Sequence, residues 1–180
     1  FDKGVSTNGG RFLEVAPANW YGNNEPRGAW GCYGNIISPS TSIGSGLQNT
    51  LNMNECSQIA QTVLNTNING YDDWFLPSIE ELNEIYSRLH QNNIGNFNID
   101  DYYWSSTDYS EIGAYFIDFN DGSLGDNNKN DATEYFRPIR FVDEITGCTD
   151  PYATNYDETA TLDNGSCLFS LDDTSKFTYG

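Results

Sequence analysis

The chain has 180 residues, of which 37% are hydrophobic and 14% are aromatic, and its 26 acidic residues against 8 basic ones give a formal net charge of -18. This length accommodates one domain with a hydrophobic core and a small appendage, and the aromatic content argues against disorder. Because nucleic acid, anionic lipid and sulfated glycans all require a basic patch, the charge excludes nucleic-acid binding and attachment to an anionic membrane.

The first predicted elements are a strand over residues 12–16 and a weak helix over roughly 55–65. Between them, Cys32 and Cys56 enclose a stretch rich in glycine, serine and threonine. A disulfide between these cysteines would attach the long loop to the weak helix, and the alternative is two buried thiols.

The clearest predicted helix covers residues 78–91. Pro77 precedes Ser78, and Glu81 follows three residues later, which is the pattern of a capping box with Ser78 as the N-cap. Apolar residues recur at helical spacing along one face, and polar residues occupy the opposite face. The predicted buried stripe consists of Ile79, Leu82, Ile85, Tyr86 and Leu89.

Short strands between turns rich in glycine and asparagine are predicted at 102–105, 114–119 and 135–142. Two of the predicted strands are expected to form a hairpin around Asp121-Gly122. Pro138 lies inside the last strand and indicates an edge or a bulge there, because proline cannot donate a ladder hydrogen bond.

The apolar pattern divides the chain into three regions. Residues 1–143 are predicted to form the main domain, 144–168 a small acidic module bracketed by cysteines, and 169–180 a linker or tail. In the module, Cys148 and Cys167 enclose Asp, Asn, Glu and Thr side chains, which provide neither burial for a free thiol nor further soft ligands for zinc. A disulfide between these cysteines is therefore predicted.

Disulfides form and persist in oxidising environments, so we expect the protein outside the reducing cytoplasm, in the extracellular space or at the cell surface. No run of about 18 apolar residues occurs, so no membrane-spanning helix is expected. The chain starts at Phe1 rather than Met, which suggests a mature fragment or an excised domain.

Several short motifs follow one another in a fixed order through residues 1–142. They are Trp30-Gly-Cys-Tyr33, the stretch GYDDWFLP at 70–77 with the capped helix after it, Tyr103-Trp-Ser-Ser106, Phe119-Asn-Asp-Gly122 and Phe136-Arg-Pro-Ile-Arg140. The set resembles the Legionella collagen-like C-terminal domain family, whose members have a C-type-lectin-like fold related to formylglycine-generating enzymes. The resemblance implies an α+β fold in which two helices pack on short antiparallel strands with many loops, followed by the small disulfide-stapled module.

The chemistry of several of these residues predicts their roles independently of the family resemblance. Trp74, Leu76 and Trp104 are predicted to lie in the core, since large aromatic and aliphatic side chains dominate small cores. Arg137 and Arg140 are predicted to pair with buried carboxylates.

The resemblance also implies a binding or adhesion module at the outer surface of a bacterium or phage, with a ligand face built by the loops near the C-terminal strands. In this chain those loops span 109–130, where rigid aromatic rings occur among adaptable polar side chains. The expected ligand is a protein or a neutral glycan, and the alternative is that the segment is a solvated, turn-rich hairpin. The candidate ligand-binding residues are Tyr109, Tyr115, Asp118, Asn120, Ser123, Asp126, Asn127, Asn128 and Asn130.

The sequence departs from two groups of related proteins. The calcium-dependent sugar site of animal C-type lectins uses Glu-Pro-Asn or Gln-Pro-Asp followed by Trp-Asn-Asp, and this chain contains none of these tripeptides. Members that bind sulfated polysaccharide present cationic surfaces, whereas this chain is strongly acidic. Neither kind of ligand is expected here.

Residues 147–167 resemble a short module that recurs in surface proteins of marine and gliding bacteria and is related in character to thrombospondin type 3 repeats. Calcium takes about 6 to 8 oxygen ligands from flexible loops, and this module is rich in such oxygens. Calcium is the expected ion, and the alternative is a metal-free turn closed by the disulfide. The candidate ligands are Asp150, Asn155, Asp157, Thr159, Thr161 and Asp163.

No catalytic residue is predicted. His90 is the only histidine, and it falls at the end of the capped helix, where it complements the helix dipole. A serine or cysteine hydrolase needs a base beside its nucleophile, and the many carboxylates single out no pair for glycoside cleavage. The alternative to a binding module is a structural spacer or filament subunit that contacts other domains or copies of a larger surface protein, and a hydrolase is the least favoured function.

Overall fold

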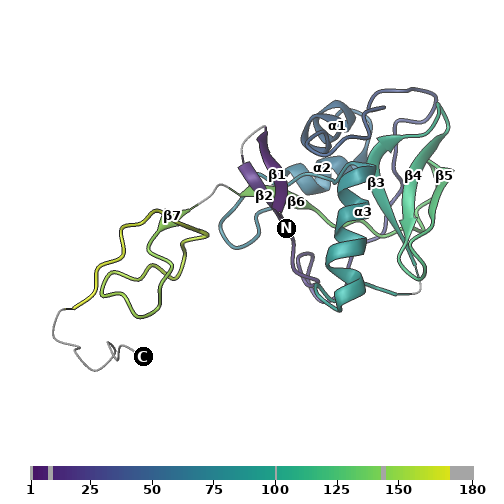
Figure 1. Cartoon of the computed structure of the whole chain (residues 1–180). Helices are drawn as coiled ribbons and strands as arrows, with labels where there is room; N and C mark the ends of the chain where they lie inside the picture. Colours follow the sequence, from purple (N-terminus) through teal and green to yellow (C-terminus); the bar gives the residue numbers. More distant parts are fainter. Residues whose placement is uncertain (1, 8–9, 100, 143–144, 171–180) are drawn as a thin grey trace. The chain divides into compact units, whose positions relative to one another are not determined.

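The computed structural model describes residues 2–7, 10–99, 101–142 and 145–170, with the backbone alone for 2–7 and 10–11. The chain forms two compact units, Phe1–Phe141 and Val142–Gly180 (Figure 1). Most of the predicted tail at 169–180 lies outside the described residues.

The first unit has a mixed α+β architecture. Its helices are α1 (Gly46–Met53), α2 (Gln58–Leu64) and α3 (Ile79–Arg88), and the short 3-10 helix η1 (His90–Asn92) follows α3. The expectation of two helices was therefore wrong, because α1 lies in the stretch interpreted as a long loop. Its buried residues include Asn49 and Thr50, so the helix lacks the apolar stripe by which an amphipathic helix is recognised.

Helix α3 confirms the predicted capping box. The backbone N–H of Glu81 donates to Ser78 Oγ at 3.3 Å, and the backbone N–H of Ser78 donates to Glu81 Oε2 at 2.8 Å. The helix buries Ile79, Leu82 and Ile85, while Tyr86 and Leu89 are half-buried against the same core. Glu81 is also buried, and its carboxylate is compensated there by a further hydrogen bond, which it accepts from the N–H of Gly44 at 2.8 Å.

Two small sheets complete the unit. Strands β1 (Asp2–Thr7), β2 (Gly10–Val15) and β6 (Ile139–Val142) form one sheet in the order β1-β2-β6. Strands β3 (Tyr102–Asp108), β4 (Gly113–Asp118) and β5 (Leu124–Asn128) form the other, an antiparallel sheet in the order β3-β4-β5.

The predicted hairpin turn occurs around residues 119–123, but the strand after it is β5, which was not among the expected strands. The expected strand at 135–142 divides at Pro138, and only its second half forms β6. Its first half runs beside β3, because Trp104 N donates to Tyr135 O and Tyr135 N donates to Tyr102 O, both at 2.9 Å.

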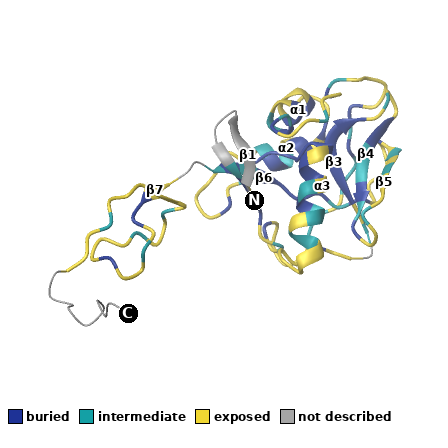
Figure 2. Cartoon of the chain, in the orientation of Figure 1, coloured by how far each residue is buried: buried dark blue, intermediate teal, exposed yellow. Residues whose placement is uncertain are grey.

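The core lies between the helices and the β3-β4-β5 sheet (Figure 2). Trp74, Leu76 and Trp104 are at most 1% exposed, which confirms their predicted place. Arg137 pairs with Glu25, and both side chains are 2% exposed. Arg140 pairs instead with Asp73 and Glu14, whose side chains are about half exposed, so the prediction of a buried partner was wrong for Arg140.

The second unit is small and mostly irregular. It contains the two-residue strands β7 (Thr146–Gly147) and β8 (Leu162–Asp163), which pair in parallel. The disulfides are Cys148–Cys167 in this unit and Cys32–Cys56 in the first, with 4.8 Å between the Cα atoms of each pair. The predicted sequential pairing is confirmed.

Candidate functional site

The predicted ligand residues do not lie on one face, because the β4–β5 hairpin separates them between its two ends (Figure 1). Gly113 pairs with Asn128 at one end of the hairpin, and Ile117 pairs with Leu124 at the other. Since Gly113 and Ile117 are four residues apart along β4 and a strand rises about 3.3 Å per residue, the two ends lie roughly 13 Å apart.

Asp118, Asn120 and Ser123 lie at or beside the hairpin turn. Asp118 Oδ1 accepts the backbone N–H of Asn120 at 2.8 Å, and the backbone N–H of Asp118 donates to Ser123 O at 2.9 Å. These contacts hold the turn. Asn127 is also set apart, because its side-chain N–H donates to Oε1 of the buried Glu134.

The other end of the hairpin brings five predicted residues together. The rings of Tyr109 and Tyr115 make an edge-to-face contact with 5.2 Å between their centroids. Asp126 is the ladder partner of Tyr115, and Asn128 Oδ1 accepts the backbone N–H of Asn130 at 3.0 Å. This end is therefore the candidate site.

A loop that the sequence did not point to joins this end. The backbone N–H of Gly34 donates to Glu111 O at 2.8 Å, which places residues 33–36 beside the β3–β4 loop. We call the exposed residues of segments 33–36, 109–112 and 126–130 the three-loop surface. Its large side chains are each about half exposed: Tyr33 (48%), Ile36 (55%), Tyr109 (54%) and Ile112 (50%).

The position of the 33–36 loop depends on the glycine and cysteine that precede it. Gly31 has a φ of +83°, and a Cβ there would lie 2.5 Å from Cys56 O, so only glycine fits. Cys32 then donates its backbone N–H to Cys56 O at 3.0 Å and forms the disulfide with Cys56. The Gly-Cys-Tyr-Gly pattern was the available sequence signal for this loop.

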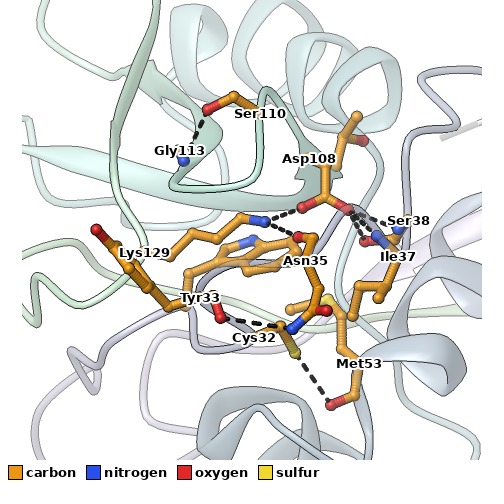
Figure 3. A network of polar contacts seen from close by, with 12 residues as sticks. Cys32, Tyr33, Asn35, Ile37, Ser38, Met53, Asp108, Ser110, Gly113 and Lys129 are labelled. Atoms are coloured by element: carbon orange, nitrogen blue, oxygen red, sulfur yellow. Dashed lines mark hydrogen bonds and ion pairs between the residues drawn. The ribbon is translucent and has the colours of Figure 1, made fainter.

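A buried ion pair lies beneath the three-loop surface (Figure 3). The side chains of Lys129 and Asp108 are 0% and 1% exposed, and Lys129 Nζ donates to Asp108 Oδ1. The same ammonium group donates to Asn35 O at 2.7 Å and lies 4.6 Å from the ring centroid of Trp30. One cation thus connects β3, the end of β5 and the 33–36 loop.

The second oxygen of Asp108 holds the same loop from its other side. Asp108 Oδ2 accepts the backbone N–H groups of Ile37 at 2.7 Å and Ser38 at 2.6 Å, together with the Ser38 hydroxyl at 3.3 Å. The backbone N–H of Asp108 returns a hydrogen bond to Ser38 O at 3.0 Å. The loop is therefore fixed to the sheet by charge-assisted hydrogen bonds in a buried environment.

Each basic side chain that the structure describes forms an ion pair with a carboxylate. Lys129 and Arg137 are in buried pairs, while Arg27, Arg88 and Arg140 pair with acidic residues nearer the surface. The side chains of the other three basic residues, Lys3, Arg11 and Lys176, lie outside those that the structure describes. The described surface therefore offers no unpaired cation to an anionic ligand.

A second polar cluster surrounds the buried pair of Glu25 and Arg137. Tyr103 donates its hydroxyl to Glu25 Oε2, and its pKa is raised by burial and by the neighbouring Glu25 carboxylate. Asn98 donates to the same carboxylate oxygen at 3.1 Å. A cavity of about 220 Å³ lies here, lined by Ala18, Asn23, Asn24, Glu25, Asn96, Asn98 and Tyr135.

A wider groove of about 470 Å³ lies along α1, where amide and hydroxyl side chains predominate. Many of these groups bond within the protein, as when Asn49 donates to Ser40 O at 2.7 Å and Asn52 donates to Ile37 O at 3.0 Å. The lining residues are Pro39, Ser40, Ile43, Gly44, Ser45, Gln48, Asn49 and Asn52.

His90 is half-buried within an aromatic cluster. Its ring centroid lies 5.1 Å from that of Phe119, 5.4 Å from that of Tyr86 and 6.0 Å from that of Phe97. These contacts give the imidazole a packing role beyond the expected interaction with the helix dipole.

The predicted calcium ligands of the second unit lie in turns that they stabilise themselves. Asp150 Oδ1 accepts the N–H of Tyr152 at 2.9 Å, and Asp163 Oδ1 accepts the N–H of Gly165 at 3.0 Å. Asp157 Oδ1 accepts the hydroxyl of Thr159 at 2.6 Å and its N–H at 2.9 Å, and these hydrogen bonds lower the pKa of Asp157.

The remaining candidates bond in the same way. Asn155 bonds to Ser166 O and to the N–H of Leu168, and Thr161 Oγ1 accepts the N–H of Ile145. Within the described residues, no three His, Cys, Asp or Glu side chains lie together as metal ligands. Calcium also takes amide, hydroxyl and backbone carbonyl oxygens, which are not among these side-chain types, so calcium binding stays a prediction.

Comparison with known proteins identifies one family. Residues 20–140 match the family model described as the Lcl C-terminal domain, so the match covers all three helices, the β3-β4-β5 sheet and the three-loop surface. No curated protein matches the chain.

Proposed function

Because the chain belongs to the Lcl C-terminal domain family, which is bacterial and surface-associated, we propose that its first unit is a binding module of a surface protein. The two disulfides fit an extracellular or secreted protein. Among the described residues no helix has the length and apolar character needed to cross a membrane.

The observation that carries this proposal is the three-loop surface. Four large side chains, Tyr33, Ile36, Tyr109 and Ile112, stand about half exposed on loops that are joined by backbone hydrogen bonds. Exposed aromatic and aliphatic groups at one place on a soluble protein are typical of contact surfaces. The buried Lys129 and Asp108 pair fixes these loops, and a rigid surface loses less conformational entropy when it binds.

Charge narrows the ligand to neutral or cationic molecules. The described cations are paired, and the acidic residues Glu111, Asp126 and Asp131 are exposed on or beside the three-loop surface. A sulfated or phosphorylated ligand would meet carboxylates there without a compensating cation. A protein or an uncharged glycan fits this surface better.

An array of glycans and proteins, probed with the intact chain, tests the proposal. We expect binding that is lost when Ile36 and Ile112 are both changed to serine and that persists in Ile94→Ser, since Ile94 is equally exposed but lies outside the three-loop surface. Equal binding by both variants would place the contact elsewhere. Reproducible silence across the array would favour the structural alternative, in which a neighbouring chain covers the surface.

A separate role for the second unit is calcium binding, as its sequence suggests. Calorimetric titration of the intact chain with calcium is the direct test, because Asp150, Asp157 and Asp163 each use only Oδ1 in the hydrogen bonds of their turns and keep a second carboxylate oxygen for a cation. Heat of binding with a raised melting temperature would support the role. A flat titration would leave a metal-free module closed by its disulfide.

A further inference from the structure

Tyr109 and Asp126 of the three-loop surface converge with Ser110 above a glycine in β4. A Cβ atom built on Gly113 would lie 3.1 Å from Ser110 Oγ, 3.3 Å from Asp126 Oδ2 and 3.4 Å from Tyr109 Cδ1. The missing side chain at position 113 therefore lets the Tyr109 ring and the Asp126 carboxylate approach the strand together. Ser110 contributes by accepting the N–H of Gly113 at 3.0 Å.

A second ring enlarges the aromatic part of this cluster. Tyr115 lies two residues after Gly113 on the same face of β4 and is the ladder partner of Asp126. Its ring meets that of Tyr109 at an angle of 68°, with 5.2 Å between the centroids. Tyr109, Tyr115 and Asp126 thus combine two aromatic walls with one carboxylate.

The Asp126 carboxylate is available to a ligand. The side chain is exposed, and the structure gives it no ion pair or hydrogen bond among the described residues. Lys129 is three residues away in sequence, but its ammonium group is buried against Asp108. Because Glu111 and Asp131 are also exposed nearby, the local field favours a positive charge.

We propose that Tyr109, Tyr115 and Asp126 form a recognition site for an arginine side chain of a basic protein segment. This inference rests on the proposed function, because it names the chemistry of a ligand for the three-loop surface. A planar guanidinium stacks on a tyrosine face while its N–H groups bond a carboxylate in a bidentate manner. The exposed Ile112 next to the cluster provides apolar contact for the methylene groups of the arginine.

The test uses the intact, oxidised chain and two labelled peptides, one alternating glycine and arginine and one in which neutral citrulline replaces each arginine. Binding is followed by fluorescence anisotropy at an ionic strength of about 0.15 M, where long-range attraction is screened. We expect the arginine peptide to bind at least about tenfold more tightly than the citrulline peptide, from one charge-assisted contact and one cation–π contact. Equal affinities for the two peptides, or no binding of the arginine peptide, would overturn the inference.

Variants separate local recognition from the attraction of the whole acidic chain. Asp126→Asn should remove most of the tenfold preference, whereas Asp121→Asn, which makes the same charge change at the opposite end of the hairpin, should leave it intact. Tyr109→Leu should weaken the arginine peptide about threefold or more, and Tyr109→Phe should not. Equal losses from Asp126→Asn and Asp121→Asn would reduce the effect to net charge and contradict the site.

Failure of the arginine site and failure of the proposed binding function give different experimental results. If an array ligand is lost in the Ile36 and Ile112 double variant but binds Asp126→Asn normally, the three-loop surface is a binding surface and the arginine site is wrong. If arginine recognition depends on Asp126 and Tyr109 while the array is silent, the arginine site stands and the array lacked a partner of the right chemistry.

Discussion

Replacing Lys129 with methionine is the most informative perturbation of the first unit. Methionine has a similar length and fills the same space, so the change removes the charge and the hydrogen bonds while leaving little cavity. Lys129 Nζ bonds Asp108 Oδ1 and Asn35 O, and its side chain is fully buried. The substitution therefore leaves a buried carboxylate oxygen and a partly buried carbonyl without their donor.

The magnitude follows from what remains around Asp108. Removing one partner of a buried ion pair costs about 3 to 5 kcal/mol, because the other charge stays buried without compensation. Asp108 Oδ2 still accepts bonds from Ile37 and Ser38, which places the expected loss in the lower half of that range. Adding the carbonyl of Asn35, we expect Lys129→Met to lower the free energy of unfolding by about 3 to 4 kcal/mol.

Urea unfolding followed by tryptophan fluorescence measures this loss. The four tryptophans, Trp20, Trp30, Trp74 and Trp104, all lie in the first unit, so the signal reports that unit alone. The double variant Lys129→Met with Asp108→Asn should recover about 2 kcal/mol, since the uncompensated charge is gone. A loss below about 1 kcal/mol for Lys129→Met, or strict additivity in the double variant, would refute the reasoning.

Three further outcomes are expected. The pKa of Tyr103 is raised by burial and by Glu25. The contribution of its neutral hydroxyl to the free energy of unfolding is therefore complete below the ordinary tyrosine pKa of about 10 and is lost as the pH rises above it. In urea unfolding, Tyr103→Phe should flatten this decline in the free energy of unfolding at alkaline pH. The pKa of Asp157 is lowered by its hydrogen bonds with Thr159, so its contribution is lost as the pH falls below about 4; in a carboxyl NMR titration, Thr159→Val should raise the Asp157 pKa, and an unchanged value would contradict that cause. Replacing Cys148 and Cys167 with serine should cost the second unit about 3 kcal/mol by the chain-entropy estimate; proteolysis should then cleave within 147–167 while tryptophan fluorescence of the first unit stays unchanged.

Local signals explain which elements could be predicted. Helix α3 carries a capping box and an apolar stripe, so two independent patterns marked it. Helix α1 carries neither, because Asn49 and Thr50 face the interior and use their side chains for hydrogen bonds to Ser40 and Leu76. Sequential pairing of the cysteines is favoured because it keeps each bridge within its own region of the chain, and the disulfides are paired in that way.

The candidate site was predicted only in part, because its other half comes from distant sequence. The segment 109–130 contains Tyr109, Tyr115 and Asp126, but alternation along β5 turns Asn127 to the opposite face of the sheet. The 33–36 loop reaches the site through a disulfide and hydrogen bonds across more than 70 residues, and no local pattern encodes such a contact. A single lysine in an asparagine-rich strand end likewise gives no sign that residue 129 is buried.

The order of strands in the first sheet makes the first unit a natural cassette. The first strand β1 and the last strand β6 of the unit lie on either side of β2 in the same three-stranded sheet. The β4–β5 hairpin belongs to the other sheet, across the core from these strands (Figure 1). A unit whose first and last strands belong to one sheet has its two ends in the same part of the fold, which is the arrangement that tolerates domain insertion. Substitutions in the β4–β5 hairpin therefore fall in a different sheet from the strands that carry the two ends of the unit.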